Sequence, residues 1–92
     1  MPLQIDHDPD SGRFSTQLDG HEAELVYRQR AGRMVIDHTG VPEAIRGRGV
    51  AAALVKAALD HARAAGLRVV PQCSYSAAYL QRHPEYADLV DA

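Results

Sequence analysis

Two arginines and two glycines alternate in the segment Arg46-Gly47-Arg48-Gly49, immediately before a stretch with helical periodicity. The first backbone amides of a helix have no partners within it and its dipole is positive there, so an acidic residue is usual and arginine is unfavourable. Glycine disfavours a helix but lets a ligand approach the backbone. A phosphate or pyrophosphate bound by these amides and both arginines explains the pattern. The alternative is that Glu43 caps the helix and the arginines are solvated.

The common nucleotide motifs do not fit this segment. Gly47-x-Gly49-x-x-Ala52 matches the spacing of the dinucleotide fingerprint, but that motif needs a strand leading directly into the glycines and an acidic residue about 20 positions later. Residues Pro42 to Ile45 intervene, and the following apolar run ends without an acid. A phosphate-binding loop of the Walker type fails as well, because Val and Ala follow Gly49 instead of Lys and Ser or Thr. The sequence therefore disfavours nucleoside triphosphate hydrolysis.

The residues before Pro42 alternate between apolar and polar types, which predicts short strands. Turn-forming residues separate these runs at Asp8–Gly12, at Asp19-Gly20 and at Ala31-Gly32. Asp-Gly between two alternating runs is typical of a two-residue β-hairpin. The predicted strands are Leu3–Asp6, Phe14–Leu18, His21–Arg28 and Met34–Val41. Four strands in succession indicate an antiparallel meander.

The period changes after Pro42. Apolar residues recur at helical spacing from Val50 to Ala62, and Gly66 is expected to end this helix. Leu67–Pro71 is a short apolar strand, and Ser76–His83 forms a second helix that must end before Pro84. A strand, a helix and a strand in one sheet make a right-handed crossover, so the fifth strand runs parallel to the fourth. The predicted fold class is α+β.

Composition limits the classes of protein. The chain has 92 residues, 46% of them hydrophobic, and a formal net charge of -2. This length predicts one domain spanning residues 1–92, with a modest core that leaves both a monomer and a homodimer open. A net negative charge provides no general attraction for nucleic acid. We therefore expect no nucleic-acid partner.

Cysteine and histidine usage bears on location and metals. The single cysteine, Cys73, cannot form an intramolecular disulfide, and no apolar run reaches the roughly 20 residues that span a bilayer. The first residues lack the basic and apolar regions of a signal peptide. We expect a cytoplasmic protein without a membrane partner. We also expect no metal, because the five histidines lie in different elements and Cys73 has no second thiol at zinc spacing.

The glycine-rich loop resembles the acyl-coenzyme A loop of the GNAT acetyltransferases, a motif of Gln or Arg, two residues, Gly, one residue, then Gly or Ala. Arg46, Gly49 and Ala51 occupy its fixed positions. Further segments occur in the order seen in the minimal single-domain branch of that superfamily, the small GNAT-like N-acetyltransferase domains: His38-Thr39-x-Val41-Pro42, Pro71-x-Cys73-Ser74-Tyr75 and Arg82-His83-Pro84-Glu85-Tyr86. The resemblance covers the chain from the fourth strand onward and implies acetyl-coenzyme A, or coenzyme A, as cosubstrate.

The resemblance also implies which residues bind the coenzyme. Loop amides hold the pyrophosphate, the residues before them shape the turn, and the fourth strand lends backbone groups to the pantetheine arm and the acetyl carbonyl. The coenzyme-binding residues expected on this basis are Thr39, Gly40, Val41, Arg46, Gly47, Arg48, Gly49, Val50, Ala51 and Ser74. The short turn at residues 8–12 leaves no room for the helices that usually form one wall of the acceptor pocket. An open acceptor side suits a peptide or protein amine.

Three side chains are candidates for catalysis. Cys73 lies where the resemblance places the coenzyme thiol, so it is a general acid, a nucleophile or a packing residue. Nothing in Gln72 or Ser74 supplies a positive charge or an imidazole to lower its pKa, which favours an acid or packing role. Tyr79 is either the phenolic general acid that many GNAT enzymes use or part of a small core. His38 is a titratable base near neutral pH or a solvated strand residue.

The branch commonly has Glu where this chain has Gly40. The base must then be His38, Asp37, a water molecule or an already neutral amine. The leading hypothesis is an N-acetyltransferase that transfers acetyl directly to an amine acceptor within a ternary complex. The alternatives are a coenzyme A binding module without turnover and a small interaction domain that binds no cofactor. The sequence does not name the acceptor.

Overall fold

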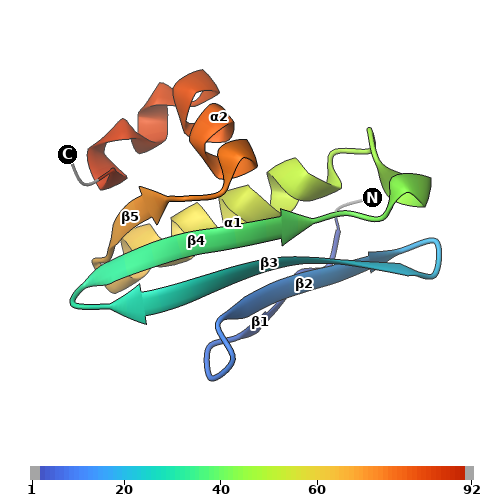
Figure 1. Ribbon diagram of the computed structural model, residues 1–92, viewed down its shortest axis with the longest axis horizontal. Helices are drawn as coiled ribbons and strands as arrows, with labels where there is room; N and C mark the ends of the chain where they lie inside the picture. The colour runs from blue at the N-terminus through green and yellow to red at the C-terminus, as the bar shows by residue number, and fades with distance from the viewer. Residues whose placement is uncertain (1–2, 91–92) are drawn as a thin grey trace.

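The computed structural model describes residues 3–90 and contains one sheet of five strands in the order β1-β2-β3-β4-β5 (Figure 1). The strands are β1 (Asp6–Asp8), β2 (Arg13–Leu18), β3 (His21–Arg30), β4 (Arg33–Gly40) and β5 (Arg68–Pro71). The first four pair antiparallel, and β5 pairs with β4 in parallel. The predicted α+β meander with a parallel fifth strand is confirmed.

Helix α1 (Val50–Ala65) provides the crossover from β4 to β5 and packs against the sheet. Its buried face meets the inward side chains of the strands, among them Leu25 and Ile36, both with no exposed surface. We call the side of the sheet that faces α1 the inner face and the other side the outer face. Gly66 ends the helix in the left-handed conformation, as the sequence predicts.

The Asp19-Gly20 hairpin is also confirmed, with φ of 52° at Asp19 and 78° at Gly20, as a type I′ turn requires. The first strand is displaced from its predicted place. It comprises Asp6–Asp8 instead of Leu3–Asp6, because pairing with β2 starts at the tight turn itself, where Asp8 is opposite Arg13. The preceding apolar residues, Leu3 and Ile5, pack against the core outside the ladder.

The C-terminal part is more helical than predicted. Helix α2 comprises Ser74–Arg82 and ends before Pro84, as expected, but it begins two residues earlier than the predicted Ser76. Two 3₁₀ helices, η1 (Glu43–Ile45) and η2 (Pro84–Leu89), were not predicted. No helix in residues 3–90 is long and apolar enough to cross a membrane.

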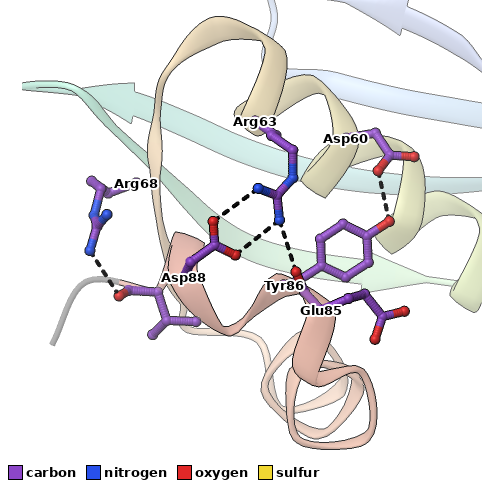
Figure 2. A network of polar contacts seen from close by, with 7 residues as sticks. Asp60, Arg63, Arg68, Glu85, Tyr86 and Asp88 are labelled. Carbon is purple, nitrogen blue, oxygen red and sulfur yellow. Dashed lines mark hydrogen bonds and ion pairs between the residues drawn. The ribbon is translucent and has the colours of Figure 1, made fainter.

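A polar network holds η2 against α1 (Figure 2). Arg63 of α1 donates to both carboxylate oxygens of Asp88 at 2.9 and 3.0 Å. The Tyr86 hydroxyl donates to Asp60 at 2.7 Å, and the Arg63 guanidinium lies 5.7 Å from the centre of the Tyr86 ring. Because η2 follows α2 directly, these contacts also restrict where α2 can lie.

Candidate functional site

A β-bulge interrupts the pairing of β3 with β4. Tyr27 is opposite Ile36, but the preceding residue, Val26, is opposite His38, so Asp37 is an extra residue in β4. A bulge changes the alternation of side chains beyond it, and bulges are common beside active sites because they re-aim side chains. The end of β4 therefore does not continue the alternation of its first half.

The bulge determines which face each residue at the end of β4 occupies. Asp37 forms an ion pair with Arg28 at 2.7 Å on the outer face. His38 is exposed and follows it on the same face. Thr39 is opposite the buried Leu25 and so returns to the inner face.

The strands β4 and β5 separate at this point. The last paired residues are Ile36 and Pro71. The carbonyl oxygen of Ile36 accepts hydrogen bonds from the amides of Gln72 at 3.1 Å and Cys73 at 3.0 Å, which closes the parallel ladder. Beyond them β4 continues to Gly40 without β5 beside it. One edge of β4 is therefore available for an extended ligand.

A cavity of about 590 Å³ lies between this open edge, the loop before α1 and the first turns of α1. Its lining combines strand, loop and helix residues, and most of their side chains are small or apolar. The lining residues are His38, Thr39, Gly40, Val41, Ile45, Arg46, Gly47, Gly49, Val50, Ala51, Ala52 and Tyr75. The cavity thus brings together much of the site expected from the sequence.

The loop that enters α1 leaves the start of the helix uncapped. Gly49 is the N-cap, with φ of 78°, and no side chain caps the helix. A Cβ built on Gly47 or Gly49 meets nothing within 4 Å. The alternative that Glu43 caps this helix is wrong, because Glu43 instead begins η1 and is exposed. Amides in the first turn, such as that of Val50, have no partner inside the helix.

The two loop arginines have different partners. The Arg46 Nε donates to the carbonyl oxygen of Val41 at 3.2 Å, which links the loop to the end of β4. The Arg48 guanidinium forms an ion pair with Asp19 at 2.5 Å, at the tip of the hairpin between β2 and β3. Arg46 lines the cavity, but Arg48 does not. The helix start therefore has one arginine at the cavity and one held by a carboxylate.

Cys73 is the N-cap of α2 and lies beside Thr39, with 3.5 Å between its Sγ and the Thr39 Oγ1. Burial raises the pKa of its thiol, but hydrogen bonds from the Ser76 backbone, the Thr39 hydroxyl and the Tyr75 backbone outweigh burial and leave the pKa below its ordinary value. Gln72 and Ser74 supply no positive charge or imidazole, as the sequence indicates, but these hydrogen bonds lower the pKa without one. Two of the groups that stabilise the thiolate are backbone amides in the first turn of α2, which begins two residues before its predicted start.

The tyrosine at the cavity is Tyr75, which is 41% exposed. Tyr79 does not line the cavity; it is buried in the core and stacks on His83 with 3.8 Å between ring centres. Burial raises the pKa of Tyr79. This placement agrees with the core role for Tyr79, one of the two that the sequence leaves open. Tyr75 was missed, although it lies one helical turn before Tyr79.

The remaining expected residues lie outside the lining. Ser74 is exposed at the start of α2, and Cys73 reaches the cavity only through its contact with Thr39. Within residues 3–90, no group of three or more His, Cys, Asp or Glu side chains could hold a metal ion. The site is therefore a cleft with an uncapped helix start at one end and a thiol and an imidazole near the other.

Three comparisons relate this chain to known proteins. Residues 13–89 match a family model described as GCN5-related N-acetyl-transferase. The NATD1 protein of Gallus gallus is 36% identical over 86 residues, covering 90% of this chain and 78% of its own length. Human NATD1 is 35% identical over 86 residues, covering 90% and 76%. A solution structure of a GCN5-like putative N-acetyltransferase from Staphylococcus aureus has a TM-score of 0.77 and 31% identity, covering 98% of this chain and 89% of its own.

Proposed function

Because the chain belongs to the GCN5-related N-acetyltransferase family, we propose that it binds acetyl-coenzyme A in the cavity and transfers the acetyl group to an amine. The observation that carries this proposal is the uncapped start of α1 at one end of a cavity of about 590 Å³. Free amides and a positive helix dipole suit the pyrophosphate, and the small and apolar lining suits the pantetheine arm.

Each part of the cavity has a role in this proposal. The amides of Arg48, Gly49, Val50 and Ala51 hold the pyrophosphate, and the bare backbone of Gly47 and Gly49 permits close approach. Arg48 contributes its amide because Asp19 holds its guanidinium. The open edge of β4 at residues 39–41 pairs with the pantetheine arm, as in strand addition. Ser74, exposed at the entrance to α2, is proposed as a further contact.

The transfer is proposed to be direct, within a ternary complex. Acetyl-coenzyme A supplies an acetyl group activated as a thioester. His38 accepts one proton from the acceptor ammonium, and the neutral amine then forms a C–N bond to the acetyl carbon while the C–S bond breaks. Cys73 gives its proton to the departing sulfur and regains one from the new amide nitrogen. The products are the acetylated amine and coenzyme A with a free thiol, and His38 releases one proton to solvent.

The binding step is tested by two matched variants at opposite ends of α1. Gly49 and Gly66 both have positive φ, 78° and 71°, and an added Cβ meets nothing within 4 Å at either position. Gly49→Ala and Gly66→Ala should therefore destabilise the fold by similar amounts, about 1–2 kcal/mol. Only Gly49→Ala places a methyl group where the pyrophosphate must approach.

Isothermal titration with coenzyme A is the measurement. We expect Gly66→Ala to bind like the wild type and Gly49→Ala to lose at least about 10-fold in affinity. Equal affinities in the two folded variants would overturn the assignment of the phosphate site. Thiol release with acetyl-coenzyme A and a panel of amines then tests transfer, because a protein that binds the coenzyme but releases no thiol is a binding module.

A further inference from the structure

On the outer face at the end of β4, an imidazole lies over a residue that has no side chain. His38 and Gly40 are both on this face, and both line the cavity. A Cβ built on Gly40 would lie only 2.8 Å from the Nε2 of His38. The imidazole therefore lies over the bare backbone of Gly40, in the space that a side chain at that position would fill.

The register of the sheet places a glutamate on the strand next to this imidazole. Glu24 of β3 is directly opposite Gly40. Directly opposite residues in an antiparallel pair have their Cβ atoms about 5 Å apart. Because the Nε2 of His38 lies 2.8 Å from the Cβ position of Gly40, the His38 ring is on the same face of the sheet as Glu24 and one strand away from it. Val26, opposite His38 itself, is apolar and offers no charge.

Charge on this part of the outer face is unbalanced. Arg13 binds Oε1 of Glu24 through Nε at 2.7 Å and Oε1 of Glu22 through Nη2 at 2.6 Å. One guanidinium thus serves two carboxylates, which leaves one net negative charge. The Glu24 side chain is 38% exposed, so water and ligands can reach it. The other pair nearby, Arg28 with Asp37, is neutral as a whole.

We propose that Glu24 binds the ammonium group of the acceptor beside His38, so that the protein acetylates cationic primary amines that approach from the outer face of the sheet. This inference rests on the proposed function and adds to it the class and the direction of the acceptor. In this proposal the ammonium contacts Glu24, and one of its protons points to His38, whose ring lies over the bare backbone of Gly40. Once His38 has taken a proton, the neutral amine can attack the acetyl group at the open edge of β4.

The chain offers a matched control in Glu22. Both glutamates pair with Arg13 on the outer face, but Glu22 is two residues further along β3, opposite Gln17 instead of Gly40. Glu24→Gln and Glu22→Gln remove equivalent charges and break equivalent ion pairs. Only Glu24→Gln removes a carboxylate next to His38. Glu24→Asp keeps the charge and serves as the rescue variant.

Steady-state thiol release with two acceptors is the test: an alkylamine, protonated at pH 7, and an aromatic amine, neutral at pH 7. We expect Glu24→Gln to raise KM for the alkylamine about 10-fold, as loss of a charge-assisted contact implies. KM for the aromatic amine and for acetyl-coenzyme A should stay within about 2-fold, and Glu22→Gln should leave all three unchanged. Glu24→Asp should recover most of the alkylamine KM.

Four results would overturn the inference. An unchanged alkylamine KM in Glu24→Gln, with coenzyme binding and transfer intact, refutes it while the proposed function stands. Equal effects of Glu24→Gln and Glu22→Gln, or equal effects on the charged and neutral amines, show that general charge or folding is responsible. A wild-type protein that binds coenzyme A but transfers acetyl to neither amine overturns both the transfer proposal and this inference.

Discussion

Replacing Cys73 separates the three roles open to its thiol. The Sγ lies 3.5 Å from the Thr39 hydroxyl at the start of α2, and the pKa of the thiol is below its ordinary value because hydrogen bonds outweigh burial. As a general acid in direct transfer, its loss in Cys73→Ala should lower kcat by about 10² to 10⁴-fold. If Cys73 only packs, Cys73→Ala should hardly change kcat. If Cys73 is a nucleophile, Cys73→Ala should lose nearly all turnover. A lowered pKa also suits a nucleophile, but we expect the general-acid result because we propose that transfer is direct, within a ternary complex.

The assay combines kinetics with intact-protein mass spectrometry. Coenzyme A affinity should be nearly unchanged in Cys73→Ala, because Cys73 lies behind Thr39 at the edge of the cavity and acts in the proposal only as the sulfur departs. Wild-type protein mixed with acetyl-coenzyme A alone should gain no acetyl group. A stoichiometric, thiol-labile acetyl adduct that is absent from Cys73→Ala would refute direct transfer and establish a covalent intermediate.

The pKa of the thiol can be measured independently through the pH dependence of alkylation. Because the thiolate is the reactive form, a lowered pKa moves the midpoint of alkylation below that of an unfolded reference peptide. Thr39→Val removes one hydrogen bond that favours the thiolate, so the midpoint should move upward. A midpoint at or above the reference in the wild type would contradict the geometry at the start of α2.

Three further predictions concern stability. Tyr86→Phe removes the hydrogen bond to Asp60 at 2.7 Å and should lower the free energy of unfolding by about 1 kcal/mol in urea denaturation. This difference should shrink below about pH 4, because the Asp60 pKa is lowered in the fold and its carboxylate protonates there. Burial and the neighbouring His61 lower the His7 pKa in the fold, so the unfolded chain binds more protons at this residue. The free energy of unfolding should therefore fall as pH falls through about 6.5. His61→Gln should make this dependence of stability on pH less steep. Leu54→Ala, at a fully buried position in α1, should lower stability by about 3 kcal/mol in the same assay at pH 7.

Local signals account for the parts of the fold that could be predicted. Asp19-Gly20 specifies its own hairpin because few other residue pairs adopt two positive φ values. Gly66 ends α1 because glycine adopts a positive φ readily. The parallel β5 follows from the single helix between β4 and β5, which returns the chain to the end of the sheet where β4 began. The start of β1 was misplaced because Asp8 suits both a turn and the end of a strand. Its pairing with Arg13 depends on the rest of the sheet.

The candidate site divides in the same way. The loop from Arg46 to Gly49 was predictable because the electrostatics of a helix start depend on a few adjacent residues. Which tyrosine faces the cavity was not predictable, because Tyr75 and Tyr79 are one helical turn apart in α2 and so lie on the same side of that helix. Their orientation depends on how α2 is placed against the sheet, which includes a hydrogen bond from the Cys73 amide to Ile36, a contact between distant segments. The low thiol pKa was missed for the same reason.

The bulge at Asp37 is the feature that sequence alternation could not reveal and on which the proposed mechanism most depends. Uninterrupted alternation would put His38 on the inner face with Ile36 and would turn Thr39 outward. One extra residue instead leaves Thr39 inside, against the Cys73 thiol, and His38 outside, over Gly40. In the proposed reaction the thiol that protonates the leaving sulfur and the imidazole that deprotonates the amine must act on opposite sides of one acetyl group. A strand edge with a single bulge meets that requirement of the proposed reaction with neighbouring residues, because His38 and Thr39 then lie on opposite faces of β4.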